Sequence, residues 1–266
     1  MSAHLPRFTV VTICRNALAG LRRTVETVLG QRYLALEYWI VDGASTDGTV
    51  EYLRGLDARR VSVLSEPDRG ISDAMNKGLS LASGEWVAFL HAGDEYLPGA
   101  LATVGAIASV SDAEVLAGYI LRRERTGDVL CRCDPSRLRN DMTINHPATW
   151  VRRDTFERCG GFDPALKNAM DYDLFLRLHV AGVRFQVVPQ PLVVMPEGGQ
   201  SDRSLWASLE ETHQVRRRHL RAGWQRSPVL LWWYFIKGTV RVTLQRIGLN
   251  TVVAWYRRHL ARPRKG

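Results

Sequence analysis

Cysteine is scarce in this sequence, and long apolar runs are missing from it. The four cysteines form no CxxC pair and no cluster with the spacing of metal ligands. This pattern favours free, reduced thiols over a disulfide framework or a zinc site. No segment reaches the ~20 apolar residues that a membrane-spanning helix needs, and residues 1–6 lack the apolar core of a signal peptide. We therefore expect a protein of the cytoplasm.

Acidic residues are missing from the C-terminal end of the chain. Residues 212–266 contain thirteen Lys and Arg and no Asp or Glu, whereas residues 1–211 contain 23 basic and 27 acidic residues. The net charge of +9 therefore comes from a basic tail on a mildly acidic body. Such a tail fits an acidic partner, which can be a nucleic acid or an anionic membrane surface.

Two familiar nucleotide-binding motifs are also absent. No GxGxxG follows the first apolar run, which argues against a Rossmann dinucleotide site, and no GxxxxGK[ST] is present, which argues against a P-loop. Instead, strand-like and helix-like segments alternate along the N-terminal part of the chain. The predicted strands are residues 8–14, 38–41, 61–64 and 86–90, and the predicted helices are residues 18–29, 49–56 and 71–82. This alternation predicts an α/β fold with a parallel sheet and right-handed crossovers.

The pattern is less regular after residue 98. It predicts helices over residues 101–109, 155–159, 171–181 and 205–220, and strands over residues 115–121, 129–133 and 185–188. No internal repeat or low-complexity tract is present.

Two of the predicted strands end near a carboxylate. Strand 38–41 is followed by Asp42, and strand 86–90 leads into His91-Ala92-Gly93-Asp94. In open α/β sheets, ligands bind at the carboxyl ends of the strands. There Asp42 can accept hydrogen bonds from a nucleobase or a ribose, and Asp94 can hold a hard divalent cation beside substrate phosphates. The alternative for both residues is an ordinary turn aspartate.

Asp171 and Asp173 lie at the start of a predicted helix. A catalytic base must sit at the mouth of the site, where it receives the proton of a hydroxyl group. A helix start at the sheet edge can hold a carboxylate there. Because the two residues are only two positions apart, they diverge on the helix, so only one can face the pocket. The alternative is that one of them is a helix N-cap.

The segment 66–78 carries cations around a helix start. Arg69 comes just before the predicted helix, and Lys77 lies inside it. Helix N-termini and cationic side chains both favour phosphate groups. The alternative is a capped surface helix with solvated charges.

Five motifs, taken in order, resemble those of family 2 glycosyltransferases with the GT-A fold. They are TVVTICRN (9–16), VDGASTDG (41–48), DRGISDAMNKG (68–78), GEWVAFLHAGD (84–94) and MDYDLFLR (170–177). The resemblance covers roughly residues 7–200. The last three motifs are similar to those of transferases that build bacterial surface polysaccharides and glycolipids, including mycobacterial phenolic glycolipids.

The resemblance implies a fold and a domain organisation. The fold would be α/β of the GT-A type, with a Rossmann-like, mostly parallel sheet flanked by helices. The catalytic domain would span residues 1–204, with a nucleotide-sugar half at 1–98 and an acceptor half at 99–204. Residues 205–266 would form a basic, amphipathic helical region.

The resemblance also implies roles for single residues. Asp94 matches the last Asp of the family's metal-binding motif and would hold Mg²⁺ or Mn²⁺ on the diphosphate, aided by Glu95. Asp171 matches the base that activates the acceptor. His146 and Asp173 are acceptor-side candidates, although His146 can also be a hydrogen-bonded loop histidine. The nucleotide-sugar site would comprise Thr12, Asn16, Asp42, Arg69, Asp73, Lys77, Ala92 and Gly93.

The implied reaction is an inverting, metal-dependent hexosyl transfer from a nucleotide-diphosphate sugar. Asp171 would deprotonate an acceptor hydroxyl, which attacks the anomeric carbon, while the metal stabilises the departing diphosphate. The acceptor would be lipid-linked or a polysaccharide. The alternative from another class is an inactive scaffold protein that binds sugar nucleotides at the membrane. Gly93 favours this alternative, because the family often has an acid at that position.

The basic tail combines aromatic residues with arginines. Its apolar residues recur at near-helical spacing, at Leu230, Trp233, Val240, Leu244 and Ile247. Residues 226–266 therefore predict an interfacial helix on the anionic inner face of the cytoplasmic membrane. We expect no nucleic-acid partner, because no base-stacking motif accompanies the arginines. The alternative is a helical pair that packs on the core with solvated arginines.

Overall fold

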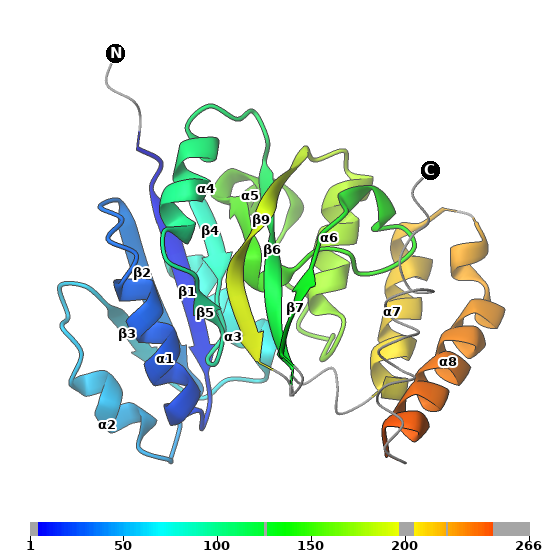
Figure 1. The fold of residues 1–266 in the computed structure, drawn as a ribbon, viewed down its shortest axis with the longest axis horizontal. Coiled ribbons are helices and arrows are strands. Elements are labelled where there is room, and N and C mark those ends of the chain that lie inside the picture. Colours follow the sequence, from blue (N-terminus) through cyan, green and yellow to red (C-terminus); the bar gives the residue numbers. More distant parts are fainter. Residues whose placement is uncertain (1–4, 125–126, 197–204, 222, 247–266) are drawn as a thin grey trace. The chain divides into compact units, whose positions relative to one another are not determined.

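A computed structural model describes residues 5–124, 127–196, 205–221 and 223–246 (Figure 1). The chain divides into two compact units, Met1–Gly199 and Gln200–Gly266. Each unit is described by itself below.

The N-terminal unit alternates strands and helices through its first hundred residues and becomes strand-rich afterwards (Figure 1). Its strands are β1 Phe8–Cys14, β2 Leu36–Asp42, β3 Ser62–Ser65, β4 Trp86–Phe89, β5 Glu95–Tyr96, β6 Val115–Glu124, β7 Gly127–Cys131, β8 Thr149–Arg152 and β9 Phe185–Pro196. Its helices are α1 Leu18–Leu29, α2 Thr49–Arg54, α3 Ile71–Leu81, α4 Ala100–Ala108, α5 Arg153–Cys159 and α6 Met170–Val180.

The strands form one mixed sheet in the order β3-β2-β1-β4-β8-β6-β9-β5, with β7 paired to β6. Strands β3, β2, β1 and β4 all run parallel to one another, so their carboxyl ends share one edge of the sheet. Strand β8 runs antiparallel to both β4 and β6, which joins the second half of the unit to the first. The predicted α/β class is confirmed.

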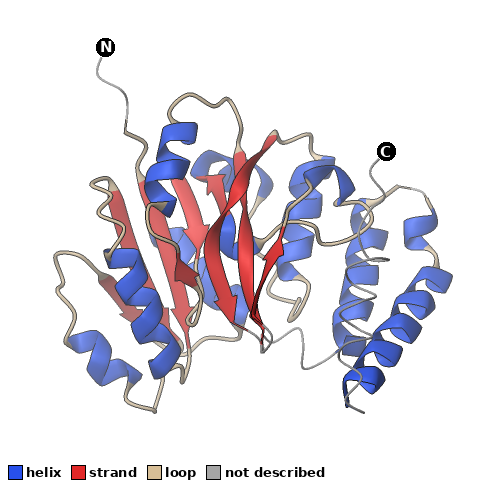
Figure 2. Cartoon of the chain, in the orientation of Figure 1, coloured by secondary structure: helices blue, strands red, loops and turns tan. Residues whose placement is uncertain are grey.

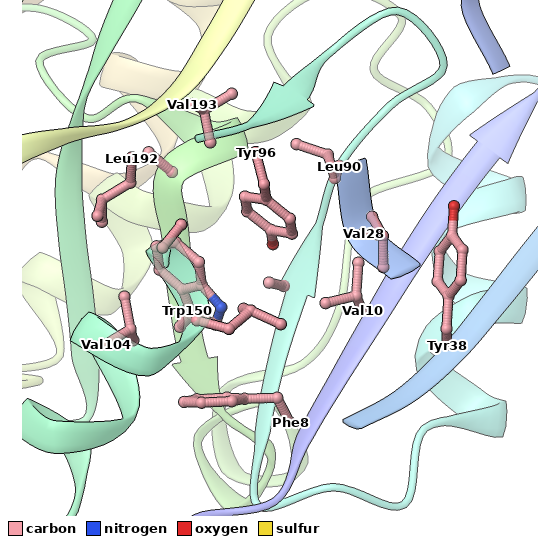
Figure 3. Packing of buried hydrophobic residues seen from close by; sticks show 14 of the residues in the cluster. Phe8, Val10, Val28, Tyr38, Leu90, Tyr96, Val104, Trp150, Leu192 and Val193 are labelled. Atoms are coloured by element: carbon pink, nitrogen blue, oxygen red, sulfur yellow. The ribbon is translucent and has the colours of Figure 1, made fainter. Parts of the chain in front are cut away.

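Helices cover both faces of this sheet (Figure 2). Because successive side chains of a strand point to opposite faces, Val10 of β1 packs in one core cluster with Val28 of α1 and Val104 of α4. Figure 3 shows this cluster, in which the rings of Tyr96 and Trp150 stack with centroids 5.8 Å apart. On the opposite face, Phe89 of β4 contacts Phe156 of α5.

Strand β9 is longer than the sequence predicted. The prediction ended at residue 188, just before Pro189 and Pro191, and proline is rare inside central strands. The strand continues to Pro196, and its pairing with β6 shifts register around Tyr119. Such an irregularity lets prolines occupy positions that need no ladder hydrogen bond.

The C-terminal unit contains helix α7, Leu205–His219, and helix α8, Pro228–Arg246. The ring of Trp206 lies 5.6 Å from that of Trp232 and 4.7 Å from that of Phe235, so aromatic packing joins the two helices. No helix among the described residues is long and apolar enough to cross a membrane. The part of the predicted membrane-binding region that spans residues 247–266 lies outside the described residues.

Candidate active site

The loops that follow β1 and β2 are joined by hydrogen bonds at the carboxyl edge of the sheet. The backbone N–H of Asn16 donates to Ser45 Oγ at 2.7 Å, and the backbone N–H of Thr46 donates to Asn16 Oδ1 at 2.8 Å. Asn16 and Ala44 both have positive φ angles, of 49° and 56°. The predicted nucleotide-site residue Asn16 thus builds the loop edge, with its side chain engaged by Thr46.

The Asp42 carboxylate is fully buried beneath this loop. It accepts hydrogen bonds from the backbone and hydroxyl of Ser45 and from the Ser65 hydroxyl, the last at 2.7 Å. The turn-aspartate alternative therefore describes its observed contacts. Thr12 is also fully buried, with its hydroxyl 3.0 Å from that of Tyr38. Direct contact of Asp42 or Thr12 with a nucleotide stays a prediction.

Asp68 brings the loop after β3 to the same edge. A Cβ on Gly43 would collide with the Asp68 carboxylate, so the glycine lets that side chain lie directly against the loop after β2. Sequence reasoning did not single out Asp68, because nothing in a one-dimensional pattern reports a loop crossing another.

The charged residues of segment 66–78 pair with one another. Lys77 Nζ lies 2.7 Å from both Glu66 Oε1 and the Pro67 carbonyl, and 3.7 Å from Asp73. The guanidinium of Arg69, which is mostly exposed, pairs with Asp73 at 3.1 Å. Helix α3 has Gly70 at its N-cap and no side-chain cap. Phosphate binding by Arg69, Asp73 and Lys77 stays a prediction.

Helix α1 fixes the turn that carries Asp94. The buried Thr24 hydroxyl accepts from the Gly93 N–H at 2.9 Å and donates to the Asp94 carbonyl at 2.7 Å. Gly93 has a φ of 112°, a conformation that side-chain-bearing residues rarely adopt. Glycine adopts this conformation more readily than the acid that the family often has at position 93, which gives the difference a conformational reason. Thr24 was not predicted, because it resembles any other buried position of an amphipathic helix.

The Asp94 side chain is nearly buried, with 7% of its surface exposed. Burial raises the pKa of its carboxyl to about 7, and the negative charges of Asp171 and Glu95 act in the same direction. A bound cation would relieve this penalty. The carboxylate of Glu95 pairs with Arg23 at 3.1 Å and Arg123 at 3.7 Å, and its role as a second metal ligand stays a prediction.

The donor set around Asp94 fits a cation that also binds phosphate. Within the described ranges, no group of three His, Cys, Asp or Glu side chains could hold a metal ion by itself. Mg²⁺ commonly keeps one or two protein carboxylates and takes its other ligands from substrate phosphates and water. The single carboxylate of Asp94 at the sheet edge suits a cation that is held partly by the protein and partly by substrate phosphates.

Asp171 faces His146 across the sheet edge. Its Oδ2 lies 3.2 Å from His146 Nδ1. Burial alone would raise the pKa of Asp171, but the adjacent imidazole and its hydrogen bond outweigh this and hold the pKa below its usual value. The N-cap of α6 is Ala169, without a side-chain cap, so Asp171 is not a capping residue.

Asp173 points elsewhere. Its buried carboxylate lies 3.5 Å from the Arg177 guanidinium, which also donates to the carbonyls of Gly160 and Gly161. The prediction that only one of the two aspartates faces the pocket is thus consistent with their different partners. As an acceptor-side residue, Asp173 stays a prediction.

Aromatic rings enclose His146 and join the two halves of the site. Its ring centroid lies 5.3 Å from that of His91, 5.8 Å from Phe89 and 5.9 Å from both Phe162 and Phe175. Burial and the neighbouring His146 lower the pKa of His91 to about 4. The turn that carries Asp94 and the helix that carries Asp171 therefore meet around these two histidines. Ala92, next to His91, is half-buried in this turn.

The chain is similar to three known proteins, two by sequence and one by fold. The chain is 34% identical over 179 residues to an uncharacterized glycosyltransferase of Mycobacterium tuberculosis, covering 65% of this chain and 68% of the relative. It is 29% identical over 177 residues to a PGL/p-HBAD biosynthesis glycosyltransferase of Mycobacterium bovis, covering 65% of this chain and 69% of the relative.

The third similarity is to a solved structure, a mannosyltransferase from Pyrobaculum calidifontis in complex with GDP-Man and Mn²⁺. The two superpose with a TM-score of 0.66 at 19% identity, covering 95% of this chain and 81% of the other. At this identity the likeness shows the fold, and it confirms the predicted GT-A arrangement. The family model described as Glycosyl transferase family 2 matches residues 9–150. With its motifs gathered at one edge of a GT-A sheet, the chain belongs to glycosyltransferase family 2 and is a glycosyltransferase.

Proposed function

We propose that the protein transfers a sugar from a nucleotide-diphosphate sugar to a hydroxyl of a lipid-linked or polysaccharide acceptor, with inversion at the anomeric carbon. The observation that carries this proposal is the convergence of Asp94 and Asp171 on the His91–His146 pair at one sheet edge. The fold neighbour solved with GDP-Man and Mn²⁺ supports the donor class. The relative named for PGL/p-HBAD biosynthesis supports a glycolipid acceptor.

Asp171 acts as the general base in this proposal. Its Oδ1 accepts the proton of the acceptor hydroxyl, and the oxygen forms a bond to the anomeric carbon as the bond to the diphosphate breaks. The lowered pKa keeps Asp171 ionised at neutral pH, ready to accept that proton. Asp94 would hold Mg²⁺ or Mn²⁺, which when bound supplies charge neutralisation for the leaving diphosphate.

The nucleotide would lie over the loops after β1, β2 and β3. Asn16 and Asp42 organise those loops, and Arg69 presents an exposed guanidinium beside them. Arg69, Asp73 and Lys77 would contact the phosphates, and Ala92 and Gly93 would approach the sugar.

The substitution Asp171→Asn tests the base. It removes the proton acceptor but keeps the shape of the side chain, so transfer should fall at least about 100-fold while donor binding persists. Asp154→Asn, on the exposed start of α5, is the matched control and should leave both unchanged. Unchanged transfer by the Asp171 variant would refute the assignment.

The C-terminal unit supports attachment to an anionic membrane surface, such as the inner face of the cytoplasmic membrane. Helix α8 exposes apolar side chains at helical spacing, each more than half exposed: Val229, Trp233, Ile236 and Val240. Residues 212–266, which include α8, have no acidic residue and thirteen basic ones. An apolar stripe within a purely basic segment suits an anionic leaflet, where a lipid-linked acceptor would be found.

A further inference from the structure

The two carboxylate oxygens of Asp171 have different surroundings. Oδ2 lies 3.2 Å from His146 Nδ1. Oδ1 is buried and has no hydrogen-bond partner in the part of the chain that the structure describes. Buried carboxylate oxygens are usually hydrogen-bonded in native proteins, so Oδ1 keeps the capacity to accept a hydrogen bond from another group.

His146 is held firmly enough to orient a neighbour. Only 6% of its surface is exposed, and it begins the 3-10 turn His146–Ala148. The preceding Asn145 donates its side-chain amide to the carbonyls of Gly118 and Cys131, both at 3.1 Å, which ties the turn to β6 and β7. A histidine enclosed in this way is poorly placed to move toward an acceptor.

We propose that His146 is a positioning residue for Asp171, in which its Nδ1–H engages Oδ2 and thereby presents Oδ1 to the acceptor hydroxyl. This inference rests on the proposed role of Asp171 as base. During transfer, the O–H bond of the acceptor breaks and its proton moves to Oδ1, while His146 keeps its own proton. A hydrogen bond formed before the reaction fixes the carboxylate in its reactive orientation, and loss of such orientation is costly to the rate.

The proposal also sets the acid limb of the pH–rate profile. Besides His146, the titratable groups that influence Asp171 are His91 and Asp94, both on the turn after β4. Of these neighbours, His146 has the largest effect and lowers the pKa of Asp171. Removing its N–H should therefore move the acid limb to higher pH, which a purely structural residue would not do.

Two amide variants of His146 test the proposal, because they place an N–H group at different positions. His146→Asn places an N–H near the site of Nδ1, whereas His146→Gln places it near the site of Nε2. We expect the Gln variant to lose about 10- to 100-fold in kcat with little change in donor KM, and its acid limb to shift upward. The Asn variant should retain most of the kcat and the wild-type acid limb.

The outcomes separate this inference from the proposed function. If Asp171→Asn transfers sugar normally, the base assignment fails and this inference fails with it. If Asp171→Asn is inactive but the Gln variant keeps the wild-type kcat and pH profile, only the positioning role is refuted. Equal losses in the Asn and Gln variants, without a shift of the acid limb, would show that His146 serves packing alone.

Discussion

At the scale of single residues, burial assigns different tasks to the aspartates that the sequence singled out. Asp42 and Asp173 are buried with several partners and organise their surroundings. Asp94 and Asp171 are less well compensated: Asp94 has a raised pKa, and the Oδ1 atom of Asp171 has no hydrogen-bond partner among the described residues. Such properties are typical of groups that await a ligand.

Asp94 gives a prediction about stability and pH. Its pKa is about 7 in the folded protein and 3.8 without the fold, so between pH 4 and 7 the native state binds more protons than the unfolded state. Stability of the metal-free protein therefore falls as pH rises through this window. Asp94→Asn should be more stable than wild type at pH 8, by roughly 2–4 kcal/mol, and the gap should close toward pH 4.

Urea unfolding of both proteins in a chelator, across this pH range, measures the effect. A gap that stays constant with pH would show that Asp94 is ionised without penalty. Mn²⁺ with a bound donor should reduce the gap, because the cation stabilises the ionised carboxylate only in the wild type.

At the scale of elements, the spacing of apolar residues was sufficient to predict the bounds of a helix that buries one face. The spacing of Leu21, Val25 and Val28 predicted a helix over residues 18–29, and α1 has those bounds with all three residues buried. The prediction failed for β9, where prolines sit at an irregular pairing that only the partner strand reveals. The contact of His146 with Asp171 also escaped prediction, because it depends on how a turn and a helix fold together.

Helix α8 carries the prediction about membranes. Trp233→Ser combined with Ile236→Ser removes two exposed apolar side chains from the stripe, so binding to phosphatidylglycerol-containing vesicles should weaken about tenfold or more. Vesicle sedimentation measures this, with neutral phosphatidylcholine vesicles for comparison.

Val110→Ser is the matched control, since Val110 is an exposed apolar residue of the N-terminal unit. It should sediment with anionic vesicles as the wild type does. Equal vesicle binding by the wild type and the double variant would show that helix α8 does not contribute to membrane attachment.

At the scale of the whole catalytic unit, parallel topology explains why distant motifs meet. Strands β3, β2, β1 and β4 deliver their following loops to one edge, and β8, antiparallel to β4, leads on from the turn that bears His146. The parallel direction of the predicted strands was enough to predict that the loops after them meet at one edge. The sequence did not predict the pairing of β8, because no strand was predicted over residues 149–152 and nothing local indicates which strand they pair with.

The central claim is that this edge binds a nucleotide-diphosphate sugar with a divalent cation at Asp94. The most direct test is a thermal-shift panel of UDP-, GDP-, dTDP- and CDP-sugars, with and without Mn²⁺, on wild type and Asp94→Asn. Because a ligand that binds only the folded state raises the Tm, one nucleotide class should raise it, and Mn²⁺ should increase that rise in the wild type alone. No rise with any donor, or an equal Mn²⁺ effect in both proteins, would contradict the claim.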